Sequence, residues 1–176
     1  ALQFVGRSTF FASAITGVVN AVYNQANMVL IVLDNSTTAM TGHQPHPGTG
    51  QTVMGEIVQK INIEQVLRGI GVTEIETINP LELEASVSCV KRMAEKTGVR
   101  AIIFKAPCIA VTKPKAPLHV DQDSCIGCKK CIRDLGCPAI VMNDGKICID
   151  ASMCTGCHLC SQVCPVCAIA GGDDHE

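Results

Sequence analysis

The first hundred residues alternate between short apolar runs and segments in which apolar residues recur every three or four positions. Residues 28–33 are continuously apolar and are flanked by turn-forming residues, which predicts a buried strand. Residues 99–104 form a second run of this kind. Residues 2–5, which lead into Gly6, and residues 74–78 are predicted to be further strands.

Three segments between these strands have the apolar period of amphipathic helices. The first is predicted to be capped by Ser8 or Thr9 and to end at Asn27. The second is predicted to begin at Asn62, which can cap it, and to end before Gly71.

The third helix is predicted to start at Asn79-Pro80 and to end before Gly98, because acidic residues fill its first turn and basic residues its last turns. Its predicted buried stripe is Leu83, Val87, Val90 and Ala94. Strands that alternate with helices indicate a mostly parallel sheet with helices on its faces.

A proline-rich segment, residues 113–117, separates this α/β region from a part of the chain with short strands, turns and cysteines. The sequence therefore predicts an α/β parallel-sheet domain over residues 1–112, a linker over 113–117 and a small α+β domain over 118–176. Asn143-Asp144-Gly145 predicts a hairpin within the last of these.

Cysteine is unusually frequent, with twelve in 176 residues, and ten of the twelve follow residue 116. The longest apolar run is too short to cross a membrane, and no secretory leader is visible. Closely spaced cysteines in a reducing compartment indicate metal ligands rather than disulfides, so we expect a cytoplasmic protein.

The charge balance argues against a nucleic-acid partner. Fourteen basic and sixteen acidic residues give a net charge of −2, and the chain has one tyrosine, four phenylalanines and no tryptophan. A nucleic-acid-binding surface needs a basic stripe, and stacking on bases needs aromatic side chains.

The cysteines form two triplets with two residues between neighbours, and every member of the second triplet lies 29 positions after its counterpart. Each triplet is followed by a Cys-Pro pair. This pattern is typical of ferredoxins with two [4Fe-4S] clusters, in which the trailing cysteine binds the other cluster. We assign one cluster to Cys125, Cys128, Cys131 and Cys164, and the second to Cys154, Cys157, Cys160 and Cys137.

Cys137 is the least certain ligand, because five residues separate it from Cys131 whereas three separate Cys164 from Cys160. Cys167 is the one plausible substitute. Zinc is the less favoured alternative, since a zinc ribbon needs two Cys-x2-Cys pairs rather than two triplets. The other thiols and one histidine are predicted to be bystanders, with the thiols buried as small apolar residues: Cys89, Cys108, Cys148, Cys167 and His158.

The polar, glycine-rich segment 33–50 leaves the carboxyl end of a predicted buried strand. Ligands bind at that edge of open parallel sheets, and such a segment can offer N–H groups and hydroxyls to a phosphate. An ordinary solvated loop is the alternative.

This segment, the stretch Gly6-x-Ser8-Thr9-Phe10-Phe11 and the cysteine tail resemble the C-terminal part of the alpha subunit of indolepyruvate ferredoxin oxidoreductases. These belong to the thiamine-diphosphate-dependent 2-oxoacid:ferredoxin oxidoreductases. The resemblance covers essentially the whole chain and implies a partial thiamine diphosphate-binding fold. We expect a fragment that lacks the pyrimidine-binding domain and is inactive alone.

The resemblance implies that Mg²⁺ holds the diphosphate through an Asp after Gly6, through Asn35 and through the Thr37 carbonyl. The implied cofactor-binding residues are Gly6, Ser8, Asn35, Thr37, Thr41, Gly42 and His43. His43 and His46 either contact the diphosphate or substrate or simply pack within the loop.

Arg7 stands at the expected Asp position, which puts Mg²⁺ in doubt because the metal usually needs a carboxylate. Three explanations are open. Arg7 contacts the diphosphate directly, or Asp34 binds the metal in place of the missing aspartate, or this chain binds the cofactor poorly. A sequence error at this position is a fourth explanation.

The family converts indolepyruvate or other aryl 2-oxoacids and coenzyme A to acyl-CoA and passes electrons through the clusters to an external ferredoxin. A second, beta subunit is implied as well. The alternative is an electron-transfer iron-sulfur protein whose α/β domain no longer binds thiamine diphosphate.

Overall fold

The computed structural model describes residues 1–171 and divides the chain into two compact units, Ala1–Thr112 and Lys113–Glu176. Residues 172–176, the end of the expected ferredoxin-type domain, lie outside the described residues. No helix within residues 1–171 is long and apolar enough to cross a membrane.

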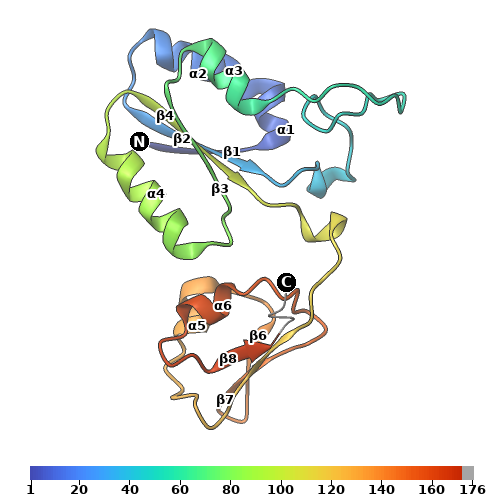
Figure 1. Cartoon of the computed structure of the whole chain (residues 1–176), viewed down its shortest axis with the longest axis vertical. Coiled ribbons are helices and arrows are strands. Elements are labelled where there is room, and N and C mark those ends of the chain that lie inside the picture. The colour runs from blue at the N-terminus through green and yellow to red at the C-terminus, as the bar shows by residue number, and fades with distance from the viewer. Residues whose placement is uncertain (172–176) are drawn as a thin grey trace. The chain divides into compact units, whose positions relative to one another are not determined.

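The first unit is a four-stranded parallel sheet with the strand order β1-β2-β4-β3. In Figure 1, α2 and α3 lie on one face of the sheet and α4 on the other. The predicted α/β class with a parallel sheet is confirmed. The elements are β1 (Leu2–Gly6), α1 (Arg7–Thr9), a π-helical turn (Phe10–Ala14), α2 (Ile15–Tyr23), β2 (Met28–Asp34), α3 (Ile63–Ile70), β3 (Glu74–Ile78), α4 (Leu83–Glu95) and β4 (Val99–Lys105).

The central strands β2 and β4 are buried on both faces, which explains their continuous apolar sequences. Alternate residues of β2 enter different cores, since side chains of a strand point to opposite faces. Leu30 packs with Leu67 of α3, whereas Ile31 packs with Met93 of α4.

The first predicted helix starts earlier and ends earlier than expected. Gly6 occupies the N-cap without a side-chain cap, so Ser8 and Thr9 lie inside the helix rather than capping it. The helix ends at Tyr23, not at Asn27, because Gln25 adopts a left-handed conformation with φ 51°.

The predicted cap of α3 is confirmed. The Asn62 side chain accepts hydrogen bonds from the N–H groups of Glu64 and Gln65, at 2.8 and 3.2 Å. Gly71 ends the helix in a left-handed conformation with φ 107°.

Helix α4 differs from the prediction in its first residue and in its buried face. It begins at Leu83, because Asn79 instead forms a turn in which its side chain accepts the Leu81 N–H at 3.0 Å. The predicted stripe is also wrong in part, since Val87 is 44% exposed and Ala94 is exposed. The helix turns a neighbouring row towards the sheet, made of Ser86, Cys89 and Met93.

The second unit is built from two antiparallel strand pairs and two short helices. The pairs are β5 with β8 and β6 with β7. The elements are β5 (Leu118–Val120), α5 (Lys130–Leu135), β6 (Ile140–Asn143), β7 (Lys146–Ile149), α6 (Leu159–Val163) and β8 (Ile169–Gly171). Asp144 and Gly145 join β6 to β7 with φ of 47° and 77°, so the predicted hairpin is confirmed as a two-residue turn of type I′ character.

Residues of the expected linker pack onto this second unit. The Lys115 N–H donates to the Thr155 carbonyl at 3.2 Å. A Cβ at Gly156 would lie 2.6 Å from the Ala116 carbonyl oxygen, so the chain passes too closely for any other residue there. The segment is therefore held by the second unit rather than being a free spacer.

The sequence duplication is visible as two equivalent halves that exchange hydrogen bonds. The Asp121 N–H, at the start of the first half, donates to the Ala168 carbonyl at 2.8 Å, and the Asp150 N–H donates to the Ala139 carbonyl at 2.8 Å. Both pairs of equivalent residues are 29 positions apart. The start of each half is thus fixed to the end of the other.

The buried row of α4 can be tested with two alanine substitutions. Met93→Ala is expected to lower the free energy of unfolding by about 2–5 kcal/mol, because it leaves a cavity in the core. Val87→Ala, the matched control, is expected to change it by less than about 0.5 kcal/mol. Urea denaturation measures both, and equal losses would contradict the observed orientation of α4.

Candidate functional site

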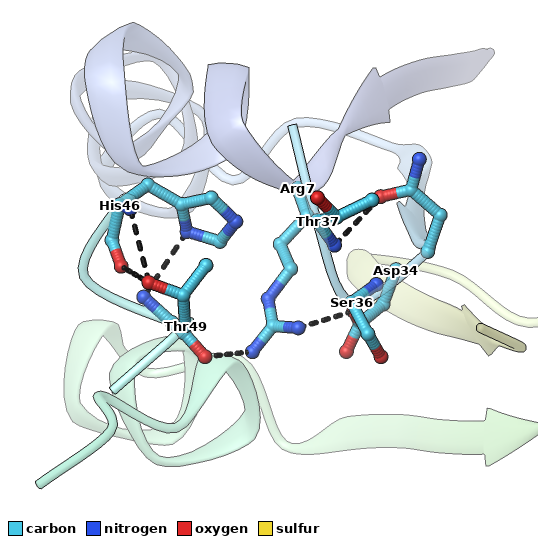
Figure 2. A network of polar contacts seen from close by, with 8 residues as sticks. Arg7, Asp34, Ser36, Thr37, His46 and Thr49 are labelled. Carbon is cyan, nitrogen blue, oxygen red and sulfur yellow. Dashed lines mark hydrogen bonds and ion pairs between the residues drawn. The ribbon is translucent and has the colours of Figure 1, made fainter. Parts of the chain in front are cut away.

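Arg7 and Asp34 form a buried ion pair at the carboxyl edge of the sheet (Figure 2). Strands β1 and β2 pair with Gly6 opposite Leu33, so the residues that follow, Arg7 and Asp34, leave the sheet side by side. The Arg7 Nη1 lies 2.7 Å from the Asp34 Oδ1, and the two side chains are 10% and 7% exposed.

The rest of the Arg7 guanidinium faces the polar loop. Its Nη2 donates to the Gly48 carbonyl. A Cβ at Gly48 would lie 2.6 Å from the Arg7 Nε, so a glycine is needed for this approach. The Nε itself is buried and has no hydrogen-bond partner within residues 1–171.

The turn after β2 uses its side-chain oxygens internally. The Asp34 Oδ1 accepts the Ser36 N–H at 3.0 Å in addition to Arg7. The Asn35 Oδ1 accepts the Thr37 N–H at 3.3 Å, and the Asn35 carbonyl accepts the Cys108 N–H at 2.9 Å. These bonds hold the buried Thr37 at the end of the strand.

His46 is fixed beside Arg7 in its neutral form. Its Nδ1 accepts the Gly48 N–H at 3.1 Å, and its ring stacks on Phe11 with centroids 5.8 Å apart. Burial and then the charge of Arg7 lower the pKa of His46, against a smaller opposing effect of Asp34. Because Nδ1 is an acceptor, Nε2 carries the proton, and it is buried without a partner among the described residues.

A cavity of about 370 Å³ opens at this edge of the sheet. Arg7 and Asp34 line it together with Thr77 of β3 and Lys105 of β4. Residues 60–64, which lead into α3, close the other side and contribute Lys60. The sequence analysis missed Lys60 and Lys105, although Lys105 directly follows the predicted strand 99–104.

The predicted cofactor-binding residues fall into two groups. Gly6 ends β1 and Ser8 lies in α1 directly after it, whereas Asn35 and Thr37 follow β2 at the same carboxyl edge. Thr41, Gly42 and His43 instead form an exposed turn, in which the Thr41 Oγ1 bonds to Gln44 at 2.6 Å and the His43 N–H donates to the Thr38 carbonyl at 2.9 Å. Among the described residues, none of the hydrogen bonds of that turn reaches Arg7 or Asp34.

Four cysteines of the second unit line one small apolar cavity: Cys125, Cys128, Cys131 and Cys164. Burial, and more weakly the neighbouring Cys128 and Cys164, raise the pKa of the Cys131 thiol. A second set surrounds Cys160, whose pKa is raised to about 11 by burial and then by Cys157, with smaller effects of Cys154 and Cys137. Four thiolates gathered in this way need a cationic centre to offset their mutual repulsion.

Cys137 belongs to this second set despite its longer spacing. Two more residues separate Cys137 from its triplet than separate Cys164 from its own. After the proline the difference is reversed, because Ala139 follows Pro138 directly whereas two residues separate Pro165 from Ala168. The extra length is therefore absorbed around the Cys-Pro pair, and the hydrogen-bonded Ala139 and Ala168 remain equivalent.

The remaining thiols are not all buried as predicted. Cys89 is buried and its Sγ lies 3.4 Å from a Glu76 oxygen, and burial and this contact raise its pKa to about 11. Cys108 and Cys148 are half-buried, and Cys167 is exposed in a left-handed conformation with φ 51°. The exposure of Cys167 follows from its place in the longer loop after Pro165.

Residues 1–104 match the protein family described as "Thiamine pyrophosphate enzyme, C-terminal TPP binding domain". The chain belongs to this family. Residues 118–165 match the 4Fe-4S dicluster domain. Thiamine pyrophosphate, also called thiamine diphosphate, and 4Fe-4S clusters are therefore the cofactors of the two parts of the chain.

Curated relatives contain both parts in the same order. A protein of Methanothermobacter thermautotrophicus is 44% identical over 170 residues, which are 96% of this chain and 28% of the relative. Proteins of Archaeoglobus fulgidus and Thermococcus kodakarensis are 39% and 40% identical over 94% and 92% of this chain, and 27% and 26% of their own length. All three are named "Indolepyruvate oxidoreductase subunit IorA". The chain spans about a quarter of their length.

The carboxyl edge of this thiamine pyrophosphate-binding domain does not suit Mg²⁺. The ion needs near-octahedral oxygen ligands and usually a carboxylate. The Asp34 Oδ1 is bonded to Arg7 and to the Ser36 N–H, and the Asn35 Oδ1 to the Thr37 N–H. A metal here would also lie close to the positive guanidinium, so Asp34 is a poor replacement for the expected aspartate.

The contribution of the buried Arg7–Asp34 ion pair to the stability of the thiamine pyrophosphate-binding domain can be tested by substitution. Arg7→Met is expected to lower the free energy of unfolding by about 3–5 kcal/mol, because it leaves Asp34 buried without its partner. Adding Asp34→Asn should recover at least half of the loss, since an amide oxygen can still accept the Ser36 N–H.

Arg68→Met is the matched control, because the Arg68–Glu64 pair is exposed and should contribute less than about 1 kcal/mol. Urea denaturation of the four proteins measures the differences. A loss for Arg7→Met no larger than that for Arg68→Met would show that the pair is not a buried constraint.

Proposed function

We propose that this chain is part of a ferredoxin-dependent oxidoreductase that oxidatively decarboxylates indolepyruvate or other aryl 2-oxoacids to acyl-CoA. One observation carries the proposal: a thiamine pyrophosphate-binding domain and a dicluster domain share one chain, in the order found in relatives named indolepyruvate oxidoreductase subunits. The first domain binds the cofactor for 2-oxoacid chemistry, and the second carries electrons. This combination suits an oxidation in which an acceptor protein takes up the electrons one at a time.

The chain's own groups have two roles in this proposal. Gly6, Ser8, Asn35 and Thr37 would hold the diphosphate at the carboxyl edge of the sheet, where Arg7 would donate hydrogen bonds to it. Thiamine diphosphate, when bound, supplies the electron sink for removal of CO₂ from a 2-oxoacid. The chain orients the diphosphate, and the cysteine unit carries electrons away.

The proposed electron path consists of two [4Fe-4S] clusters. One is held by Cys125, Cys128, Cys131 and Cys164, and the other by Cys154, Cys157, Cys160 and Cys137. Two electrons leave each substrate molecule, so the clusters pass them singly to an external ferredoxin. Coenzyme A accepts the acyl group, and a second (beta) subunit completes the enzyme. We place the protein in the cytoplasm, where reducing conditions keep the cysteines available as cluster ligands.

A second candidate is an electron-transfer protein whose α/β domain no longer binds thiamine diphosphate. The Arg7–Asp34 pair favours it, because a guanidinium stands where the family has a metal-binding aspartate and is bonded to the Oδ1 of the nearest carboxylate. The two functions differ in whether a 2-oxoacid can deliver electrons to the clusters.

The assembled oxidoreductase that contains this chain tests the enzyme function. Anaerobically, indolepyruvate and coenzyme A are expected to reduce ferredoxin, with acyl-CoA formed in proportion, as measured by absorbance and chromatography. Pyruvate serves as the comparison substrate. Clusters that accept electrons from dithionite but from no 2-oxoacid would support the electron-transfer protein instead.

Iron content tests the cluster ligands. The anaerobically purified chain is expected to hold about eight irons, and Cys160→Ser about four, because one of two four-iron clusters loses a ligand. Cys167→Ser is the matched control and should keep about eight. Iron and sulfide assays with electron paramagnetic resonance measure this, and a loss of iron in Cys167→Ser would show that Cys167 replaces a proposed ligand.

A further inference from the structure

We propose that the Arg7 guanidinium is the resident cation of the thiamine diphosphate site, so that the diphosphate binds to this chain without a divalent metal ion. This rests on the proposed function in one respect, namely that thiamine diphosphate binds at the carboxyl edge of the sheet. It goes further because it names the group that neutralises the diphosphate. It also explains why the oxygen ligands there do not suit Mg²⁺.

Arg7 is held as a fixed positive charge. The side chain is nine-tenths buried between the Asp34 carboxylate and the Gly48 carbonyl, which fix the guanidinium at the ends of β1 and β2. A guanidinium keeps its proton in proteins and offers five N–H donors in one plane. Asp34 and Gly48 use two of them and orient the remainder.

Two buried N–H donors at this edge have no partner among the described residues. They are the Nε of Arg7 and the Nε2 of His46. An unsatisfied buried donor costs about 1–3 kcal/mol, so such groups normally have an acceptor in the working state. An anionic oxygen acceptor suits the cationic Arg7, whose side chain lines the cavity, whereas His46 packs against Phe11 outside the cavity lining.

The charge lining the cavity also favours an anion. Arg7, Lys60 and Lys105 line it, whereas its carboxylates already have cationic partners: Asp34 pairs with Arg7, and Glu64 pairs with Arg68. Within residues 1–171, neither Lys60 nor Lys105 forms an ion pair. The cavity therefore has uncompensated positive charge next to the buried guanidinium.

These cations replace what a metal would contribute. Mg²⁺ bound to a diphosphate brings two positive charges and a bridge to protein oxygens. The Arg7–Asp34 pair is neutral as a whole, so the net positive charge comes from Lys60 and Lys105, whereas the remaining N–H groups of Arg7 make bidentate contacts to phosphate oxygens possible. A divalent ion placed beside the guanidinium would be repelled, so metal and Arg7 are alternatives at this edge.

Calorimetric titration of thiamine diphosphate into the assembled oxidoreductase tests the inference. With Arg7 present, the dissociation constant is expected to be the same within about twofold in Mg²⁺ and in EDTA. Binding by Arg7→Asp should depend on Mg²⁺, with affinity at least about tenfold weaker in EDTA, because a carboxylate restores a metal ligand and removes the charge. Arg92→Met, which alters an exposed arginine of α4 in the same domain and outside the cavity lining, should behave as the parent.

Arg7→Gln provides a second variant, in case two neighbouring carboxylates prevent folding of Arg7→Asp. Glutamine can still bond to Asp34 and the Gly48 carbonyl but has no charge, so binding should weaken at least about tenfold in both buffers. Inorganic pyrophosphate is the second probe and should show the same metal independence with the parent protein.

A parent protein that needs Mg²⁺, or that binds only after Arg7→Asp, would overturn the inference while leaving the thiamine diphosphate site in place. No binding by the parent or by either variant, in a preparation with full iron content, would overturn the proposed enzyme function together with the inference. Binding of pyrophosphate but not of thiamine diphosphate by the parent would also overturn it.

Discussion

The register between β1 and β2 is the constraint on which the candidate site depends. Gly6 lies opposite Leu33, so Arg7 and Asp34 leave the sheet together and their charges meet in a buried place. The loop that follows returns to this pair, since the Arg7 Nη2 donates to the Gly48 carbonyl, and the neighbouring Pro47 carbonyl accepts the Ile61 N–H at 2.9 Å. A shift of one residue in this pairing would send both charges to other positions and leave Gly48 without its arginine.

The second unit depends on an analogous exchange between its halves. The start of each half is bonded to the end of the other. Each trailing Cys-Pro pair therefore lies beside the cysteine triplet of the opposite half. The same exchange explains why the irregular spacing of Cys137 does not disturb the unit. The duplication fixes the equivalent backbone bonds of Asp121 and Asp150, and the loops around the prolines absorb the difference in length.

Local sequence patterns predicted what local forces determine. The β2 and β4 strands, the Asn62 cap and the Asp144-Gly145 turn follow from residues within a few positions of each other. The face of α4 was predicted only in part, because Val87 and Met93 have similar apolarity and the packing on β2 and β4 selects between them. A sequence period cannot show which of two adjacent rows meets the sheet.

The site was predicted less completely, for a related reason. Arg7 and Asp34 were singled out through the family resemblance, since Arg7 stands at the expected Asp position and Asp34 is the nearby carboxylate. Lys60, Gly48 and His46 come from a long loop whose return depends on distant hydrogen bonds, so no spacing rule indicates that they lie near Arg7. The exposed turn of Thr41 to His43 shows the opposite case, in which a distinctive motif lies outside the ion-pair network.

A crystal of the assembled oxidoreductase, grown with thiamine diphosphate and with Mn²⁺ in place of Mg²⁺, tests the central claim most directly. Manganese scatters anomalously, so a metal bound to the diphosphate would give its own peak. The account predicts a diphosphate in contact with the Arg7 guanidinium and no manganese peak beside Asp34 or Asn35. A peak coordinated by Asn35 and the Thr37 carbonyl, with Arg7 turned away, would contradict it.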